Sequence, residues 1–584
     1  MPLASARVEP ARLFRLALAA GLTVSALLFF LCSWRWPLVG DSALIHYIGF
    51  LIQRHWAPYR QLGDMNMPGS YLIEIAAMHL FGMGALAWRL FDFTLLGIAT
   101  AAFFLLTANL GGPSFPASSE RVGSLAALFA SSLFILIHGR DGLSEGGQRD
   151  LTMAVCLLAA TAFLFLAVRK RKLWPAAAFG LLSGIASTIK PTTLPLTLAQ
   201  LALALYALNK IQGESVVPET VIPSGARSAK SGVPGELARW GGKSRDPRIF
   251  LLVISAALAY LAAPILALIF LVRERALAAF LAGFHGIIPY YASLGHRPLS
   301  FVLLHSISPL LPLVLLWLGI LVLLRPQLHW ERAALLAGVV FGLLNCVVQQ
   351  RALPYYRYPL LVFLLPLMAI DFTRALRPGP NPSAVAPFAT ALSSRVGSVR
   401  AAKYLAALAL AFAAFFLAPQ SAVLIHRYRW WETDFISSLQ QNLNALGGSS
   451  LSGHIQCIDS ISGCGNVLYR MRLSPSTGVL SDFLLFGAAS DRQPPESIPI
   501  IRQTRAQFSA AILARPPQVI VVTSHLHMDG PDNFQKLSRW PAFAGFLATR
   551  YTLQTEWSPS RTARWWSREE TPASYRIYVL RPNP

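Results

Sequence analysis

The feature that most constrains this chain is a series of long apolar runs. A helix of about 20 apolar residues crosses the roughly 30 Å of hydrocarbon in a bilayer. Eleven such runs are present, and the apolar residues in them are continuous rather than alternating, which predicts helices and argues against a barrel of strands. The runs lie near residues 13–34, 87–110, 121–138, 151–168, 173–189, 192–208, 249–272, 301–324, 333–349, 358–371 and 403–421.

The composition agrees with a multi-pass membrane protein. Of 584 residues, 54% are apolar and only 13% are charged, whereas a soluble protein has roughly 25% charged residues. This balance excludes a soluble multi-domain enzyme, a disordered chain and a disulfide scaffold. The first run has no small-residue cleavage site after it, so we interpret it as an uncleaved first helix.

The positive charge indicates how the chain is oriented. The net charge is +23, and with a cytoplasmic N-terminus 22 of the 50 Lys and Arg residues fall on cytoplasmic loops. The cluster 169–172 is then inside, as the positive-inside rule requires. We therefore expect an inner (plasma) membrane protein of the bacterial type. Its basic charge reflects topology and attraction to membrane lipid rather than nucleic acid.

An odd number of spans places residues 422–584 outside the cytoplasm. This segment is expected to be a soluble α/β domain, with strands near 517–522 and 575–580, attached to a transmembrane domain of residues 1–421. Two of the five cysteines, Cys457 and Cys464, lie in it. An oxidising compartment permits a small-loop disulfide between them, and the alternative is two free thiols.

Polar residues gather in the predicted outer loops, 35–86 and 138–150. Asp41 stands where the first helix emerges, and Leu44, Tyr47, Ile48 and Leu51 then recur with the spacing of an amphipathic helix on the membrane surface. One interpretation is that Asp41 caps this helix. The other is that it serves as a general base.

The first outer loop resembles a known family. After Asp41 and the surface helix come Pro58-Tyr59-Arg60, an Asp-x-x-x-Pro element from Asp64 to Pro68, and a Phe81-Gly82 turn before Arg89. This order resembles the GT-C glycosyltransferases, which include the protein O-mannosyltransferases and the aminoarabinose transferases acting on lipid A. The resemblance is strongest over about residues 35–200 and continues as a topology to about residue 421.

The resemblance implies a sugar donor carried on a polyprenyl phosphate. It also implies that Asp41 is the general base and that Asp64 assists near the acceptor or a metal. Relatives often have Lys-Pro-Pro where this chain has Asn66-Met67-Pro68, so one usual phosphate contact is missing here.

The second outer loop is dense in charge for this chain. Its Gly147-Gln148-Arg149-Asp150 element resembles one that recurs in the same superfamily. Arg149 is expected to contact a phosphate in bidentate fashion. Glu145 and Asp150 are candidate ligands of a divalent metal. The alternative is a solvated loop with internal ion pairs.

Further candidate phosphate contacts follow later in the chain. Lys190 interrupts two apolar runs, where a lysine is costly without a partner, although it could also snorkel to the surface. Arg351, Tyr356 and Arg357 lie around the start of the tenth run, and an arginine followed by Tyr-Pro resembles the lipid-phosphate contact of the family. Tyrosines alone would also suit a membrane-boundary belt.

The sequence therefore predicts an inverting membrane glycosyltransferase that moves a sugar from a polyprenyl-phosphate carrier to an extracytoplasmic glycan, lipid or protein acceptor. Two other classes stay open: a transporter or flippase of a lipid-linked glycan, and a non-catalytic envelope assembly protein.

Overall fold

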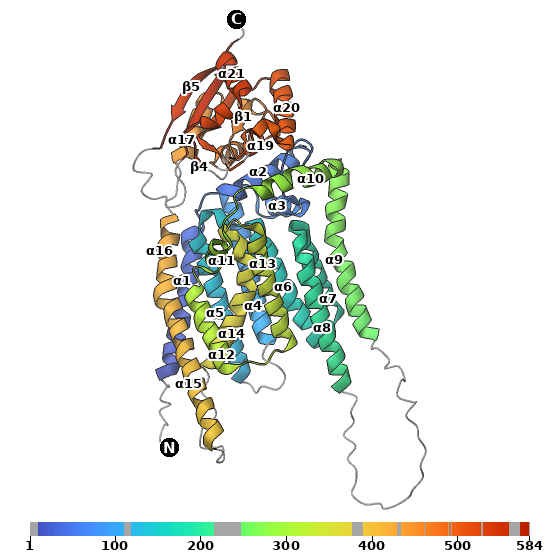
Figure 1. Ribbon diagram of the computed structural model, residues 1–584, viewed down its shortest axis with the longest axis vertical. Helices are drawn as coiled ribbons and strands as arrows, with labels where there is room; N and C mark the ends of the chain where they lie inside the picture. The colour runs from blue at the N-terminus through green and yellow to red at the C-terminus, as the bar shows by residue number, and fades with distance from the viewer. Residues whose placement is uncertain are drawn as a thin grey trace, which may run out of the picture.

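The protein is a long helical bundle with a smaller α/β unit stacked on one end (Figure 1). This computed structural model describes residues 10–109, 118–214, 247–376, 389–428, 434–460, 462–488, 490–491, 493–526, 530–559 and 573–582. Three helices lie across the end of the bundle beneath the α/β unit, so they separate the two parts: α2 (Gly40–Gln53), α3 (Pro68–Phe81) and α10 (Leu277–Ser293).

All eleven apolar runs are helical. The bundle is built from α1 (Pro10–Ser33), α4 (Ala85–Asn109), α5 (Ser118–Asp141), α6 (Arg149–Lys170), α7 (Leu173–Ile189), α8 (Leu194–Glu214), α9 (Pro247–Arg273), α11 (Leu299–Ile307), α12 (Leu311–Leu324), α13 (Trp330–Gln349), α14 (Tyr358–Ala375), α15 (Ala389–Phe412) and α16 (Ala418–Tyr428), with a short π-helical turn (Ala413–Leu417) joining the last two. Within the described residues, eight helical segments are long and apolar enough to cross a membrane, and one bent pair makes nine. The runs near 13–34 and 173–189 have shorter described apolar stretches.

One predicted span needs correction. The run 301–324 was expected to be one span, but α11 and α12 meet at an angle of 84°. The break contains Pro309, which cannot donate a backbone hydrogen bond to continue the first helix.

The helix α2 was expected to lie on the lipid surface, and the structure places it elsewhere. Tyr47, Ile48 and Leu51 are all at most 1% exposed. Protein covers both sides, because α18 (Cys464–Arg470) of the α/β unit packs on α2 from outside while α3 packs on it from the bundle. The amphipathic spacing is real, but the apolar stripe meets protein rather than lipid.

The α/β unit has a four-stranded sheet in the order β1 (Ile455–Ile458), β2 (Val519–Thr523), β6 (Tyr575–Leu580) and β5 (Tyr551–Trp557). Strand β1 runs parallel to β2, and the other two pairs are antiparallel. Besides α18, the unit contains α17 (Asp434–Ala445), α19 (Phe483–Phe486), α20 (Pro499–Ala514) and α21 (Pro541–Arg550), and a two-residue pair β3 (His525–Leu526) and β4 (Gly530–Pro531). The strands predicted near 517–522 and 575–580 are thus present.

The period-two pattern of β2 divides the core between the two faces of this sheet. Val519 and Val521 pack in the cluster that includes α2, α17 and α18. Ile520 and Val522 pack on the opposite side with Phe508 and the helices α20 and α21. One face of the sheet therefore packs toward α2, and the two share a continuous core.

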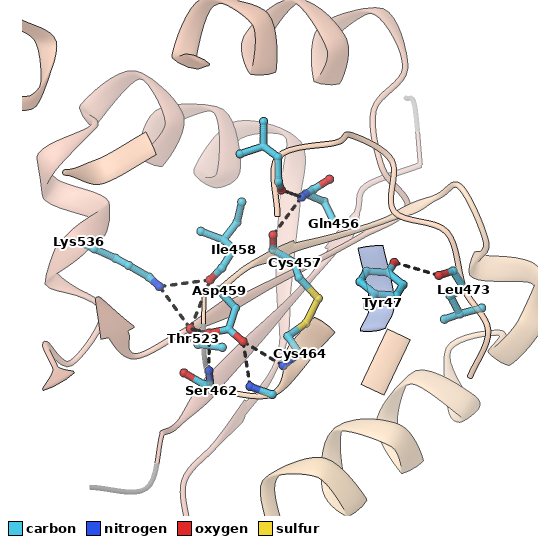
Figure 2. The surroundings of a disulfide bond; sticks show 12 residues. Tyr47, Gln456, Cys457, Ile458, Asp459, Ser462, Cys464, Leu473, Thr523 and Lys536 are labelled. Carbon is cyan, nitrogen blue, oxygen red and sulfur yellow. Dashed lines mark hydrogen bonds between the residues drawn. A yellow bond between two sulfur atoms is a disulfide. The ribbon is translucent and has the colours of Figure 1, made fainter. Parts of the chain in front are cut away.

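Cys457 on β1 and Cys464 at the start of α18 form a disulfide, the pairing expected from the sequence (Figure 2). The three other cysteines are Cys32, Cys156 and Cys346, and they are free. The bond ties α18, and through it α2, to the edge of the sheet.

Reduction of this disulfide is expected to destabilise the α/β unit by about 2–3 kcal/mol, the loop-entropy value for a closed loop of this length. Thiol titration of denatured protein should find three thiols before reduction and five afterwards. A Cys457→Ser/Cys464→Ser variant should melt at the same temperature with and without reductant. Five thiols in unreduced protein would contradict the pairing.

Candidate active site

Asp41 lies in the first turn of α2, at the end of the bundle that faces the α/β unit. The helix is capped by Val39, and no side chain caps it. The Asp41 carboxylate instead accepts a hydrogen bond of 3.1 Å from the hydroxyl of Tyr355, which is 314 residues away in the chain. The capping interpretation therefore does not account for this side chain, which faces the start of the tenth apolar run.

Arg149 joins this group from the first residue of α6. Its guanidinium interacts electrostatically with Asp41, Asp150, Tyr355 and Tyr291. It is 13% exposed and lies 3.8 Å from the Asp150 carboxylate. A guanidinium within electrostatic reach of Asp41, at the N-terminus of a helix, is a suitable group to receive an anion.

Lys190 enters the same corner from the break between α7 and α8. Its ammonium is hydrogen-bonded to the carboxylate of Asp150. The ammonium also lies over the ring of Tyr356, 5.0 Å from the centroid. The Lys190 side chain at the helix break is thus 18% exposed and paired with protein, rather than snorkelling to the surface.

Arg351 lies at the rim of the group and holds the end of α10. Its guanidinium stacks 3.7 Å from the centroid of the Tyr291 ring. It donates to the backbone carbonyls of Tyr291 and Leu294, the latter at 3.2 Å. Since a stacked guanidinium keeps free N–H groups at its edge, Arg351 can serve both α10 and an anion.

Arg357 is differently placed from its expected role as a lipid-phosphate contact. Its Nε and Nη2 donate to the two oxygens of Asp141 at 3.0 and 2.5 Å, and Nη1 donates to the carbonyl of Ser308. The two side chains are 10% and 4% exposed. The structure gives this guanidinium a bidentate partner that the sequence did not single out, although Asp141 lies in the charge-dense second outer loop.

Asp64 forms a neighbouring hydrogen-bonded group in the first outer loop. Its carboxylate accepts from the hydroxyl of Tyr71 and, at 2.6 Å, from the amide of Asn66. Burial, and next the charge of Asp64, raise the pKa of Tyr71 well above its usual value, so Tyr71 remains a donor. Arg149 interacts electrostatically with Tyr71, which links Asp64 to the Asp41 group. Asn66, at the position where the family resemblance implied a lysine, donates to the same carboxylate oxygen as Tyr71.

The two candidate metal ligands are both deeply buried. Asp150 is paired with Lys190 and Arg149, and Glu145 lies 1% exposed in a short 3-10 turn (Leu143–Glu145). Among the residues that the structure describes, no three His, Cys, Asp or Glu side chains form a group able to hold a metal. Lys190 and Arg149 thus occupy the Asp150 carboxylate, and a metal would have to compete with these two cations. A metal site remains a prediction.

A buried network that the sequence did not predict supports the second outer loop from beneath. Asp92 of α4 accepts from the backbone N–H of Gly147 at 2.7 Å and lies 3.1 Å from His138 Nε2. The other His138 nitrogen is 2.7 Å from the hydroxyl of Tyr358. Arg89 lies 3.3 Å from Asp92. In the sequence, the signal for this network was Asp92 itself, an aspartate inside an apolar span. In the structure, Asp92 anchors the loop that carries Arg149.

The loop is also fastened to α2. The carbonyl of Gly146 accepts from Ser42 Oγ at 2.9 Å and from the Trp88 indole at 3.0 Å. Ser42 directly follows Asp41, so these bonds set the distance between the general-base candidate and Arg149. The site is therefore held together by backbone and side-chain contacts between parts of the chain that are far apart in the sequence.

Comparisons with known proteins fit this arrangement. No protein-family model matches the chain, and no curated protein sequence does. Two solved structures of ArnT from Cupriavidus metallidurans are similar to it, one bound to undecaprenyl phosphate and one in the apo state. They are 13% and 14% identical, each with a TM-score of 0.54, and the match covers 96% of this chain and 97% of each ArnT chain. The chain thus has the multi-pass membrane fold of ArnT, the GT-C fold.

Proposed function

We propose that this protein is an inverting glycosyltransferase of the inner membrane, which moves a sugar from a polyprenyl-phosphate carrier to an acceptor outside the cytoplasm. The observation that carries the proposal is that Asp41 and Arg149 lie in one corner at the end of the bundle: the Asp41 carboxylate accepts from Tyr355, and Arg149 is within electrostatic reach of both. A base beside a cation is what the transfer needs: one group accepts a proton and the other receives a phosphate.

The cations around Asp41 support a phosphate-bearing donor. Arg149, Lys190 and Arg351 come from three different elements, and Tyr355, Tyr356 and Tyr291 lie among them. A lipid phosphate entering from the membrane would exchange the Asp150–Lys190 pair for its own charge-assisted hydrogen bonds. The similar ArnT structure with undecaprenyl phosphate supports a lipid carrier of this class.

In the proposed step, Asp41 accepts the proton of an acceptor hydroxyl. The freed oxygen forms a bond to the anomeric carbon of the sugar from the face opposite the phosphate. The bond between that carbon and the phosphate oxygen breaks, and its electron pair leaves with the polyprenyl phosphate. Arg149, Lys190 and Arg351 stabilise the charge that grows on this leaving group. The Tyr355 hydroxyl orients the carboxylate.

The decisive experiment incubates the purified full-length chain in proteoliposomes with radiolabelled polyprenyl-phosphate sugars and an envelope lipid and glycan extract. Transfer of label from the carrier to a second molecule supports the proposal. Label that stays on its carrier but crosses the bilayer would instead support a flippase. Label that neither transfers nor crosses would favour a non-catalytic assembly role.

The variant Arg149→Lys is expected to raise the KM for the lipid-linked donor about tenfold or more and to change kcat less. The charge is retained, but the bidentate fork is lost, and hydrogen bonds to charged groups contribute about 1.5–3 kcal/mol. The measurement is initial rate against donor concentration. Arg140→Lys is a matched control in the same loop, because the Arg140 guanidinium bonds to the Gln420 side chain of α16. Equal donor KM values in the two variants would contradict a phosphate contact.

A further inference from the structure

The helix α10 connects the candidate site with the α/β unit. It crosses the end of the bundle beneath α19 and α20 (Figure 1). It packs on α9, which precedes it in the chain, and on α20 of the α/β unit. Its last turn begins with two adjacent tyrosines, Tyr290 and Tyr291, and their side chains have different partners. The position of this helix end therefore depends on the α/β unit and on the site together.

Tyr290 binds the α/β unit. Its hydroxyl donates a hydrogen bond of 2.7 Å to the Asp491 carboxylate. The same carboxylate oxygen accepts from the backbone N–H of Ala488 at 2.7 Å, so the turn that carries Asp491 fixes the acceptor. Burial, and next the hydrogen bond to Asp491, raise the pKa of Tyr290 above its ordinary value. The hydroxyl therefore keeps its proton and remains the donor in this bond.

An apolar contact accompanies the hydrogen bond. Phe483, at the start of α19, is 1% exposed, and its ring centroid lies 6.3 Å from that of Tyr290 and 5.8 Å from that of Tyr291. Ile287 and Leu294, on either side of the two tyrosines in the chain, belong to the same buried cluster. Burial of apolar surface has no preferred direction, whereas a hydrogen bond does. The bond between Tyr290 and Asp491 is therefore the contact that sets the orientation of the helix end.

Tyr291 belongs to the candidate site. The Arg351 guanidinium stacks on its ring and donates to the carbonyls of Tyr291 and Leu294. Tyr291 also lies within electrostatic reach of Asp41 and Arg149. These three contacts of the Arg351 guanidinium are all with the end of α10, so a shift of α10 moves the guanidinium with it.

We infer that Tyr290 and Asp491 are positioning residues for the lipid phosphate: their hydrogen bond holds the end of α10 where Arg351 meets the phosphate of the donor. The inference rests on the proposed function, because it takes Arg351 as a phosphate contact. The two residues act through Tyr291 and Arg351 rather than on the phosphate itself. The α/β unit thus takes a direct part in donor binding.

The experiment measures the affinity of the full chain, in nanodiscs, for a fluorescent polyprenyl phosphate without a sugar. The variant Tyr290→Phe removes only the hydroxyl and keeps the ring against Phe483. Asp491→Asn is the conservative variant, because its amide oxygen can still accept from Tyr290. The matched control is Tyr551→Phe in the same unit, where the buried hydroxyl donates to the Pro517 carbonyl at 2.9 Å. A thermal melt verifies that each variant folds.

We expect Tyr290→Phe to weaken binding of the polyprenyl phosphate about fivefold or more, because a hydrogen bond to a charged group is stronger than one between neutral groups. Asp491→Asn should bind more tightly than Tyr290→Phe. Tyr551→Phe should bind as the wild type does, even where it melts at a lower temperature. In an Arg351→Gln background, Tyr290→Phe should add little further loss, since both changes act on one guanidinium.

The possible outcomes separate this inference from the proposed function. Wild-type affinity in Tyr290→Phe or in Arg351→Gln would overturn the inference while leaving sugar transfer open. Losses of the two variants that add in full would also overturn it, because the effect would then bypass Arg351. If the variants bind as expected but proteoliposomes transfer no sugar, the positioning role stands and the proposed function fails. A wild-type chain that binds no polyprenyl phosphate would overturn both.

Discussion

The variant Asp41→Asn is expected to lower kcat for sugar transfer by about 10²–10⁴, the usual contribution of a general base. The amide has nearly the shape of the carboxylate and can still accept from Tyr355, so α2 and its contacts should remain. The amide cannot, however, take the proton of the attacking hydroxyl. The measurement is single-turnover transfer from radiolabelled donor at saturating acceptor, together with donor binding to the same protein.

Two comparisons make this result specific. Glu556→Gln is a matched acid-to-amide change at an exposed pair with Arg576 in the α/β unit, and it should leave transfer unchanged. Asp64→Asn should retain more activity than Asp41→Asn, since Asp64 is bonded to Tyr71 and Asn66. Wild-type kcat in Asp41→Asn would remove Asp41 from the base role, and loss of folding would appear as a lower melting temperature.

Local patterns in the sequence predicted most of the fold. Apolar runs locate helices because the length needed to cross hydrocarbon is set by the bilayer. The continuous apolar run of β2 located a buried strand. Successive side chains of a strand point to opposite faces, so Val519 and Ile520 pack on different sides of the sheet. The covered position of α2 could not be predicted this way. Its apolar stripe is the same whether lipid or the α/β unit packs against it.

For the site, the sequence identified residue types and missed their pairings. Asp41, Arg149 and Lys190 stand out because charges are rare in this chain, and the structure brings them together. The partners Tyr355 of Asp41 and Asp141 of Arg357 are 314 and 216 residues away in the sequence. Such contacts depend on how helices pack, and one sequence carries no direct signal for them.

Arg357 is the residue for which expectation and structure diverge most, so it carries the second large prediction. Arg357→Gln is expected to lower the free energy of unfolding by about 3–5 kcal/mol, because it leaves the Asp141 carboxylate buried without its bidentate partner. The double variant Asp141→Asn/Arg357→Gln removes both charges and should recover much of this loss. Unfolding titrations in mixed micelles measure both values.

Stability and donor binding together separate the two roles of this guanidinium. If Arg357 is a clamp between the second outer loop and the start of α14, the double variant should bind donor with nearly the wild-type KM. A phosphate contact predicts that the double variant is stable yet has a donor KM raised as much as in Arg357→Gln alone. Arg576→Gln, at an exposed pair of 2.9 Å, is the control and should cost less than about 1 kcal/mol. If Arg357→Gln also lowered the free energy of unfolding by less than about 1 kcal/mol, the clamp would be contradicted.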